Sequence, residues 1–154
     1  MPIASSLLNK PRLVKKLRDF YDYVQKNNGQ VGTKTRGIDL NFNNACNLRC
    51  KYCFTNSPKG DHVKEYLDLG AIRKLADDAD ELGYFEFDLQ GGELLVQPKK
   101  LFDVLEAIKP ERFYLYLTTN GYYLDKAMAK KLWNLNVINI RDAATDKHKT
   151  VDDT

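Results

Sequence analysis

The feature that most constrains the fold is a strand followed by a helix, repeated along the chain. Apolar and polar residues alternate at 35–42, 84–89 and 112–118, and a short apolar run follows at 137–140. Such runs predict strands. Between them, apolar residues recur at helical spacing, as in Leu101, Leu105 and Ile108. Strands that alternate with helices are typical of parallel βα units, so we expect an α/β fold with about four such units.

An amphipathic helix at 11–24 is expected to precede these units. One face of it carries Leu13, Leu17, Phe20 and Val24, and the charged residues Lys15, Lys16, Arg18 and Asp22 lie mostly elsewhere. A row of charges on an amphipathic helix is usually its solvated face. We therefore expect the basic side of this helix to face water.

All three cysteines of the chain lie in one loop, directly after the first predicted strand. Cys46, Cys50 and Cys53 stand at positions i, i+4 and i+7 among several asparagines. A cubane iron–sulfur cluster normally takes four cysteines, so three thiolates would leave one iron open. Open coordination positions distinguish catalytic metal sites from closed structural ones. The loop is therefore a candidate reaction site.

Two other interpretations compete for these cysteines. A zinc site needs a fourth ligand, and the only histidines, His62 and His148, do not stand at a finger-like spacing from them. The same i, i+4, i+7 spacing also describes one buried face of a helix. Asn43, Asn44 and Asn47 argue against that helix, because asparagine favours turns.

The sequence Cys46-xxx-Cys50-xx-Cys53, with an aromatic residue just before the third cysteine, resembles the signature of the radical S-adenosylmethionine (SAM) enzymes. The resemblance implies a [4Fe-4S] cluster whose open iron is chelated by the amino and carboxylate groups of SAM. It also implies that reductive cleavage of SAM yields a 5′-deoxyadenosyl radical, which abstracts a hydrogen atom. The fold expected of the family is a partial (βα)6 barrel. On this interpretation residues 1–34 are an N-terminal helical extension and residues 35–154 are an incomplete radical SAM core.

A second motif, Gly91-Gly92-Glu93, follows the second predicted strand and resembles the glycine-rich SAM-binding motif of that family. Two glycines allow a backbone to approach a ligand closely, and Glu93 can accept a hydrogen bond from the SAM ammonium. The residues that the resemblance assigns to SAM are Tyr52, Gly91, Gly92, Glu93, Asn120, Asn139 and Asp142. The match departs at Leu94, where many relatives have proline. It departs again in the fourth strand, which lacks the Ser-x-Asp common in relatives.

The loops that follow parallel strands meet at one edge of the sheet, because right-handed crossovers return each strand in the same direction. Cys46–Cys53, Glu93, Asn120 and Asp142 each follow a predicted strand. We therefore expect them to gather at one rim, which is where βα folds carry their chemistry.

The motif spacing is similar to the peptide-maturase (SPASM) and molybdenum-cofactor branch of the family, and the chain stops after its fourth strand, as a truncated member would. The expected partners are an electron donor such as flavodoxin or ferredoxin and an unidentified substrate, for which a peptide is one candidate. Three alternatives stay open: an inactive N-terminal fragment, a short activating enzyme, and an iron–sulfur electron carrier or sensor.

Composition limits the partners further. The net charge of +3 is too small to indicate nucleic-acid binding by itself. No apolar run reaches the length of a membrane span, and 1–9 is too short and polar for a signal-peptide core. An odd number of cysteines without a secretion signal favours metal ligation over disulfides. We expect a cytoplasmic protein.

Overall fold

The computed structural model describes residues 9–51, 53, 55, 57, 68–135, 137 and 139–142, the last four by their backbone. Helices and strands alternate along this part of the chain, as the sequence predicts. They are α2 (Pro11–Lys26), β1 (Gly37–Asn41), α3 (Leu69–Glu81), β2 (Glu86–Gln90), α4 (Pro98–Ile108), β3 (Tyr114–Thr119), α5 (Lys126–Asn134) and β4 (Asn139–Asp142). Short 3-10 turns at Leu94–Val96 and Pro110–Arg112 flank α4. None of the helices in the described residues is both long and apolar enough to cross a lipid bilayer.

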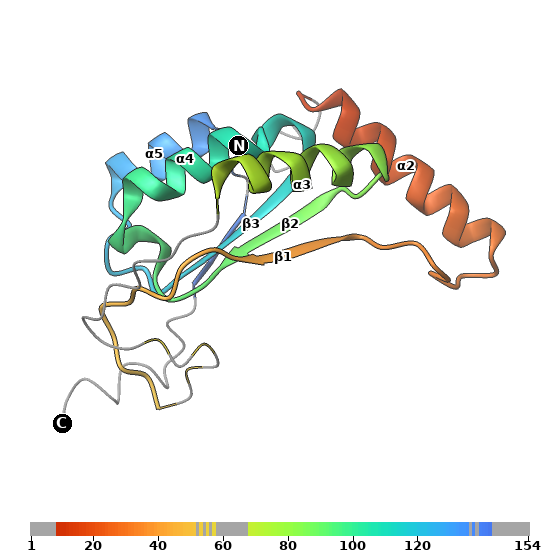
Figure 1. Ribbon diagram of the computed structural model, residues 1–154. Helices are drawn as coiled ribbons and strands as arrows, with labels where there is room; N and C mark the ends of the chain where they lie inside the picture. Colours follow the sequence, from red (N-terminus) through yellow and green to blue (C-terminus); the bar gives the residue numbers. More distant parts are fainter. Residues whose placement is uncertain are drawn as a thin grey trace.

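The strands form one parallel sheet in the order β1-β2-β3-β4. Leu40 stands opposite Leu89, and Leu89 stands opposite Leu117. Helices α3, α4 and α5 lie along one side of this sheet (Figure 1). The predicted α/β class and the parallel βα order are confirmed, and closure of the sheet into a partial barrel stays a prediction.

The core lies between the sheet and these helices. Strand alternation turns Phe87, Leu89, Leu115 and Leu117 toward the helices, and all four side chains are fully buried. Ile72, Ala76 and Ala79 of α3 and five apolar residues of α4 belong to the same cluster. A fully buried leucine or phenylalanine contributes about 1.5–3 kcal/mol relative to an exposed one, so this layer holds the strands in register.

Some predicted boundaries of helices and strands were wrong by about two residues. The segment at 110–112 forms a 3-10 turn, so β3 begins at Tyr114, two residues later than expected. β4 likewise occupies Asn139–Asp142, two residues beyond the predicted run. Helix α5 begins only after Asp125, whose carboxylate accepts a hydrogen bond from the Met128 N–H at 2.7 Å. This N-cap supplies an acceptor for an N–H that has no partner inside the helix.

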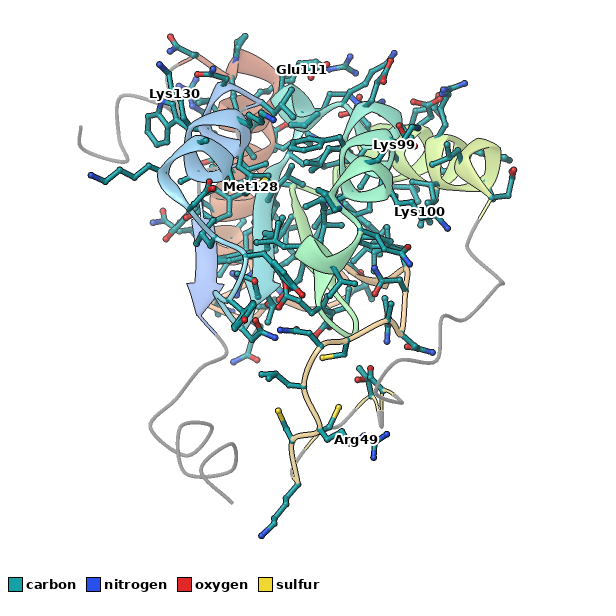
Figure 2. All side chains as sticks on the ribbon, turned by 90° about the vertical axis from the view of Figure 1, so that its left-hand side faces the viewer. Arg49, Lys99, Lys100, Glu111, Met128 and Lys130 are labelled. Atoms are coloured by element: carbon teal, nitrogen blue, oxygen red, sulfur yellow. The ribbon has the colours of Figure 1, made fainter. Side chains whose placement is uncertain are left out.

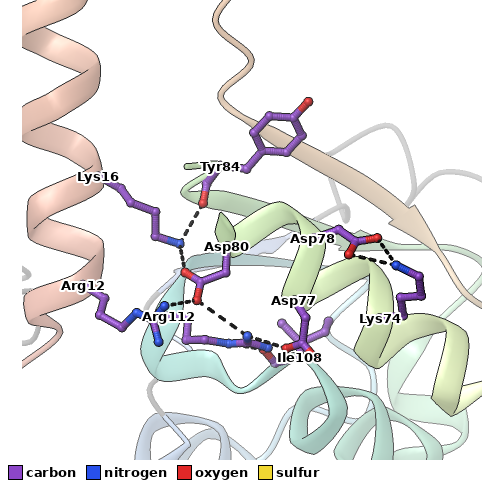
Figure 3. Close-up of polar contacts among 9 residues, drawn as sticks. All are labelled: Arg12, Lys16, Lys74, Asp77, Asp78, Asp80, Tyr84, Ile108 and Arg112. Carbon is purple, nitrogen blue, oxygen red and sulfur yellow. Dashed lines mark hydrogen bonds and ion pairs between the residues drawn. The ribbon is translucent and has the colours of Figure 1, made fainter. Parts of the chain in front are cut away.

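The basic side of α2 is not wholly solvated, so that expectation was wrong in part. Asp80 is buried near the end of α3, and its carboxylate forms ion pairs with the Arg12 guanidinium at 2.6 Å and the Lys16 ammonium at 2.8 Å (Figure 3). Lys16 also donates to the Tyr84 carbonyl at 2.8 Å. A lysine buried this far needs such partners. These contacts fasten α2 to the core near the amino ends of the strands.

Lys10, just before α2, makes a second attachment. Its side chain is fully buried, and Nζ donates to the carbonyl oxygens of Pro110 at 2.7 Å and Phe113 at 2.9 Å. Burial lowers the pKa of Lys10 to about 8, while the Glu111 carboxylate acts in the opposite direction. The predicted division at residue 34 stays a prediction.

Candidate functional site

The predicted site residues that the structure describes follow the carboxyl ends of neighbouring strands. The cysteine loop follows β1, Gly91-Gly92-Glu93 follows β2, and Asn120 follows β3. The parallel order places these segments at one end of the sheet, opposite the end that α2 covers (Figure 1). Figure 2 shows sulfur atoms close to Arg49 at this end of the molecule.

The glycine turn and the start of the cysteine loop are joined through their backbones. The Gly92 N–H donates to the Asn43 carbonyl at 3.0 Å, and the Glu93 N–H donates to the Ala45 carbonyl at 2.7 Å. A Cβ atom added at Gly91 would lie 2.3 Å from the Asn43 carbonyl oxygen, and one at Gly92 would lie 2.2 Å from that of Ala45. The close approach that requires these glycines is therefore to the cysteine loop itself.

Glu93 is fully buried and accepts three hydrogen bonds from the protein. Its Oε1 accepts from the Leu95 N–H at 2.8 Å and from the Thr119 hydroxyl at 2.7 Å, and its Oε2 accepts from the Asn120 N–H at 2.6 Å. The carboxylate thus joins the turn after β2 to the end of β3. A carboxylate has about four lone-pair sites, so the three bonds from the described residues leave one acceptor position unused, and the predicted contact with SAM stays a prediction.

Asn120 links the end of β3 to the cysteine loop. Its Nδ2 donates to Asn47 Oδ1 at 2.9 Å, and its Oδ1 accepts from the Tyr122 N–H at 3.0 Å. Sequence reasoning used Asn47 only as a residue that favours turns and missed this bond. Its position directly after Cys46 was the one signal that could have drawn attention to it.

The three cysteines are free thiols and are partly buried. Cys46 Sγ accepts from the Leu48 N–H at 3.4 Å, and Cys53 Sγ lies 3.1 Å from the Thr55 hydroxyl. The Cys53 N–H donates to the Cys50 carbonyl at 3.2 Å, which forms a tight turn between these two residues. The loop therefore presents its thiols from a hydrogen-bonded backbone.

Burial raises the pKa of the Cys46 thiol, and the nearby Glu93 and Cys53 raise it further. The N–H groups of Leu48 and Asn47 act in the opposite direction. A thiol with a raised pKa keeps its proton unless a nearby cation stabilises the negative charge of the thiolate. A bound metal ion provides that positive charge and so deprotonates the thiol.

The donor set suits an iron–sulfur cluster, for which cysteine thiolates are the usual ligands. Among the described residues, no three side chains of histidine, cysteine, aspartate or glutamate already converge on a point suited to a single metal ion. A cubane presents its irons at separate corners, so its thiolates need not converge in that way. Cys46, Cys50 and Cys53 are the residues that could hold it.

The side-chain amide of Asn43 is a buried polar group at the same rim. Its side chain is only 4% exposed, and neither Nδ2 nor Oδ1 has a hydrogen-bond partner within the described part of the chain. Its Oδ1 lies 3.3 Å from the position that a Cβ atom would take at Gly91. Buried polar groups are nearly always paired, so this amide fits a rim whose polar partners include a small molecule or water.

Several predicted residues cannot be placed. Tyr52, His62 and His148 lie outside the described residues. Asn139 and Asp142 belong to β4, which is described by its backbone, and β3 pairs with it through Tyr116 and Thr119 respectively. Their roles in SAM binding stay predictions.

The model of the Radical SAM superfamily matches residues 40–141. The chain belongs to the radical SAM superfamily. Members of this superfamily use a [4Fe-4S] cluster and SAM, which agrees with the cysteine loop and the glycine turn described above. The matched region begins near the end of β1 and ends within β4, so it contains all of β2 and β3 and the connections between the strands.

Two relatives from Methanocaldococcus jannaschii are similar over most of this chain. A probable GTP 3′,8-cyclase is 31% identical over 114 residues, which is 72% of this chain and 37% of that protein. A putative glycyl-radical enzyme activating enzyme is 35% identical over 106 residues, which is 69% of this chain and 39% of that protein. The matches therefore span well under half the length of these radical SAM relatives. A separate short match, 67% identical over 36 residues, is to a tRNA (guanine-N(1)-)-methyltransferase of Ehrlichia ruminantium and covers 23% of this chain.

Proposed function

We propose that this chain carries the cofactor-binding part of a radical SAM enzyme. Cys46, Cys50 and Cys53 would hold a [4Fe-4S] cluster, with one iron left for the amino and carboxylate groups of SAM. When bound, the reduced cluster supplies the electron that cleaves SAM to methionine and a 5′-deoxyadenosyl radical, which abstracts hydrogen from the substrate. The observation that carries this proposal is the hydrogen-bonded junction of the cysteine loop, the glycine turn and the end of β3 at one rim.

The residues of this chain would have distinct roles. The backbones of Gly92 and Glu93 hold the entry to the cysteine loop in place. The Glu93 carboxylate, which already accepts three hydrogen bonds, would use its remaining lone pair for the SAM ammonium. Tyr52, Asn139 and Asp142 would contribute further contacts to SAM.

The proposed substrate is a protein or a peptide. The name of one relative, a putative glycyl-radical enzyme activating enzyme, supports a protein substrate. The name of another relative, a probable GTP 3′,8-cyclase, refers to GTP, so GTP is the compound to be tested beside a protein or peptide substrate. The proposed electron donor is a flavodoxin or ferredoxin, since Arg49 and Lys51 are exposed within the cysteine loop and give it positive charge for an acidic partner.

The deciding experiment is anaerobic electron paramagnetic resonance of the reconstituted, dithionite-reduced protein, with and without SAM. We expect a [4Fe-4S]+ signal that shifts when SAM is added, together with formation of 5′-deoxyadenosine. Cys50→Ser should lose the signal, and Lys51→Ala, an exposed neighbour in the same loop, should keep it. A cluster that ignores SAM would overturn the proposal in favour of an electron carrier or sensor, and failure to assemble any cluster would overturn both.

A further inference from the structure

The hydrogen bond between Asn120 and Asn47 is held in one orientation. Asn120 Oδ1 is occupied by the Tyr122 N–H at 3.0 Å, so its Nδ2 is the atom that donates to Asn47 Oδ1 at 2.9 Å. The backbone of Asn120 is held as well, because its N–H donates to the buried Glu93 carboxylate at 2.6 Å. The loop is thus fastened to the end of a core strand through residues 73 positions apart.

Asn47 lies between Cys46 and Leu48, whose N–H points back to Cys46 Sγ at 3.4 Å. That N–H can face the sulfur only while the Asn47 backbone keeps its turn. The Asn47 side chain is the part of this turn that reaches across to β3. A change that releases this side chain should therefore loosen the N–H···S contact, although it touches neither partner of that contact.

We propose that Asn47 and Asn120 are a positioning pair, which holds the Leu48 N–H against the Cys46 sulfur and thereby raises the reduction potential of the cluster bound there. Hydrogen bonds to cluster sulfurs favour the reduced, more negative state and so tune the potential of iron–sulfur centres. Outer-shell partners of metal ligands commonly have this role. The effect on the potential rests on the proposed function, because it needs the cluster, whereas the effect on the loop does not.

The experiment compares Asn47→Ala, Asn120→Ala and the double variant with the parent chain. Asn44→Ala is the matched control, since Asn44 is in the same loop and its side chain makes no hydrogen bond to the described residues. Asn47→Asp is the rescue variant, because a carboxylate oxygen can still accept from Asn120 Nδ2. Hydrogen exchange of the Leu48 amide is measured without cluster, and the midpoint potential is measured after reconstitution.

We expect Leu48 exchange to quicken about fivefold in each alanine variant, which corresponds to loss of one net hydrogen bond of about 1 kcal/mol. The double variant should equal the single ones, because all three remove the same bond. Asn44→Ala and Asn47→Asp should exchange like the parent. The midpoint potential should fall in both alanine variants and stay unchanged in Asn44→Ala.

Exchange and potential that match the parent in both alanine variants would overturn the inference, and so would additive effects in the double variant. Asn47→Asp that exchanges as fast as Asn47→Ala would also overturn it, because the acceptor oxygen would then not be what holds the turn. If the parent chain binds no SAM-responsive cluster, the proposed function fails. The exchange experiment on the cluster-free protein still decides whether the pair positions the loop.

Discussion

Gly92→Ala tests whether the cysteine loop depends on the close approach of the glycine turn. The new Cβ would lie 2.2 Å from the Ala45 carbonyl oxygen and 2.8 Å from the Asn44 carbonyl carbon, both backbone atoms that cannot rotate away. Ordinary contact begins near 3.4 Å, so the two segments must separate by about 1 Å. That shift takes the 2.7 Å Glu93–Ala45 hydrogen bond out of range. The neighbouring Gly92–Asn43 hydrogen bond should weaken as well, so we expect the free energy of unfolding to fall by about 2–4 kcal/mol.

Urea unfolding of the cluster-free protein measures this loss, and iron and sulfide content after reconstitution measures its effect on the site. Gly70→Ala is the matched control, since its Cβ would meet the side-chain carboxylate of Asp68, the N-cap of α3, and no atom of another segment. We expect that control to change stability by no more than about 1 kcal/mol and to keep its iron. If Gly92→Ala has the same unfolding midpoint and iron content as Gly70→Ala, the close approach does not support the loop and the reasoning is refuted.

Three further changes test the buried charges. Glu93→Gln replaces the acceptor of the Asn120 N–H with an amide donor, so urea unfolding should show about 1–3 kcal/mol lower stability, and an unchanged midpoint would contradict this. Asp80→Ala leaves the buried Lys16 ammonium without its carboxylate, which should cost about 3–5 kcal/mol by the same assay; a loss below 1 kcal/mol, on the order of an exposed ion pair, would count against burial of the pair. The pKa of Lys10 is about 8 in the folded chain and 10.5 ordinarily. Between these pH values the unfolded chain keeps a proton on Lys10 that the folded chain has released. The free energy of unfolding should therefore rise across that window, by at most about 3 kcal/mol, with a smaller rise in Lys10→Met; equal slopes would refute the assignment.

Local patterns in the sequence were sufficient for the order of elements and for the end of the sheet at which the described candidate residues lie. Alternation in segments such as 84–89 predicts a strand because successive side chains point to opposite faces. A parallel order then brings the segments after each strand to one edge. The cysteine spacing and Gly91-Gly92-Glu93 were visible as motifs because their members are close together in the chain.

The tertiary structure decided what those residues touch. Sequence reasoning assigned Gly91 and Gly92 to SAM, which stays a prediction, and it did not foresee that the backbone of the cysteine loop is their nearest neighbour among the described residues. It expected a solvated Lys16, which instead pairs with the buried Asp80. In each case the partner lies on another element.

By itself, then, the sequence determined the α/β class, the succession of strands and helices, and the loop that carries the cysteines. Only the tertiary structure decided that Glu93 joins two strand ends and that Asn120 fastens Asn47. The physical reason is the range of the interactions. Periodicity and turn preference act over a few residues, whereas a buried carboxylate or amide takes its partners from whichever backbone the packed helices and strands bring within hydrogen-bond distance.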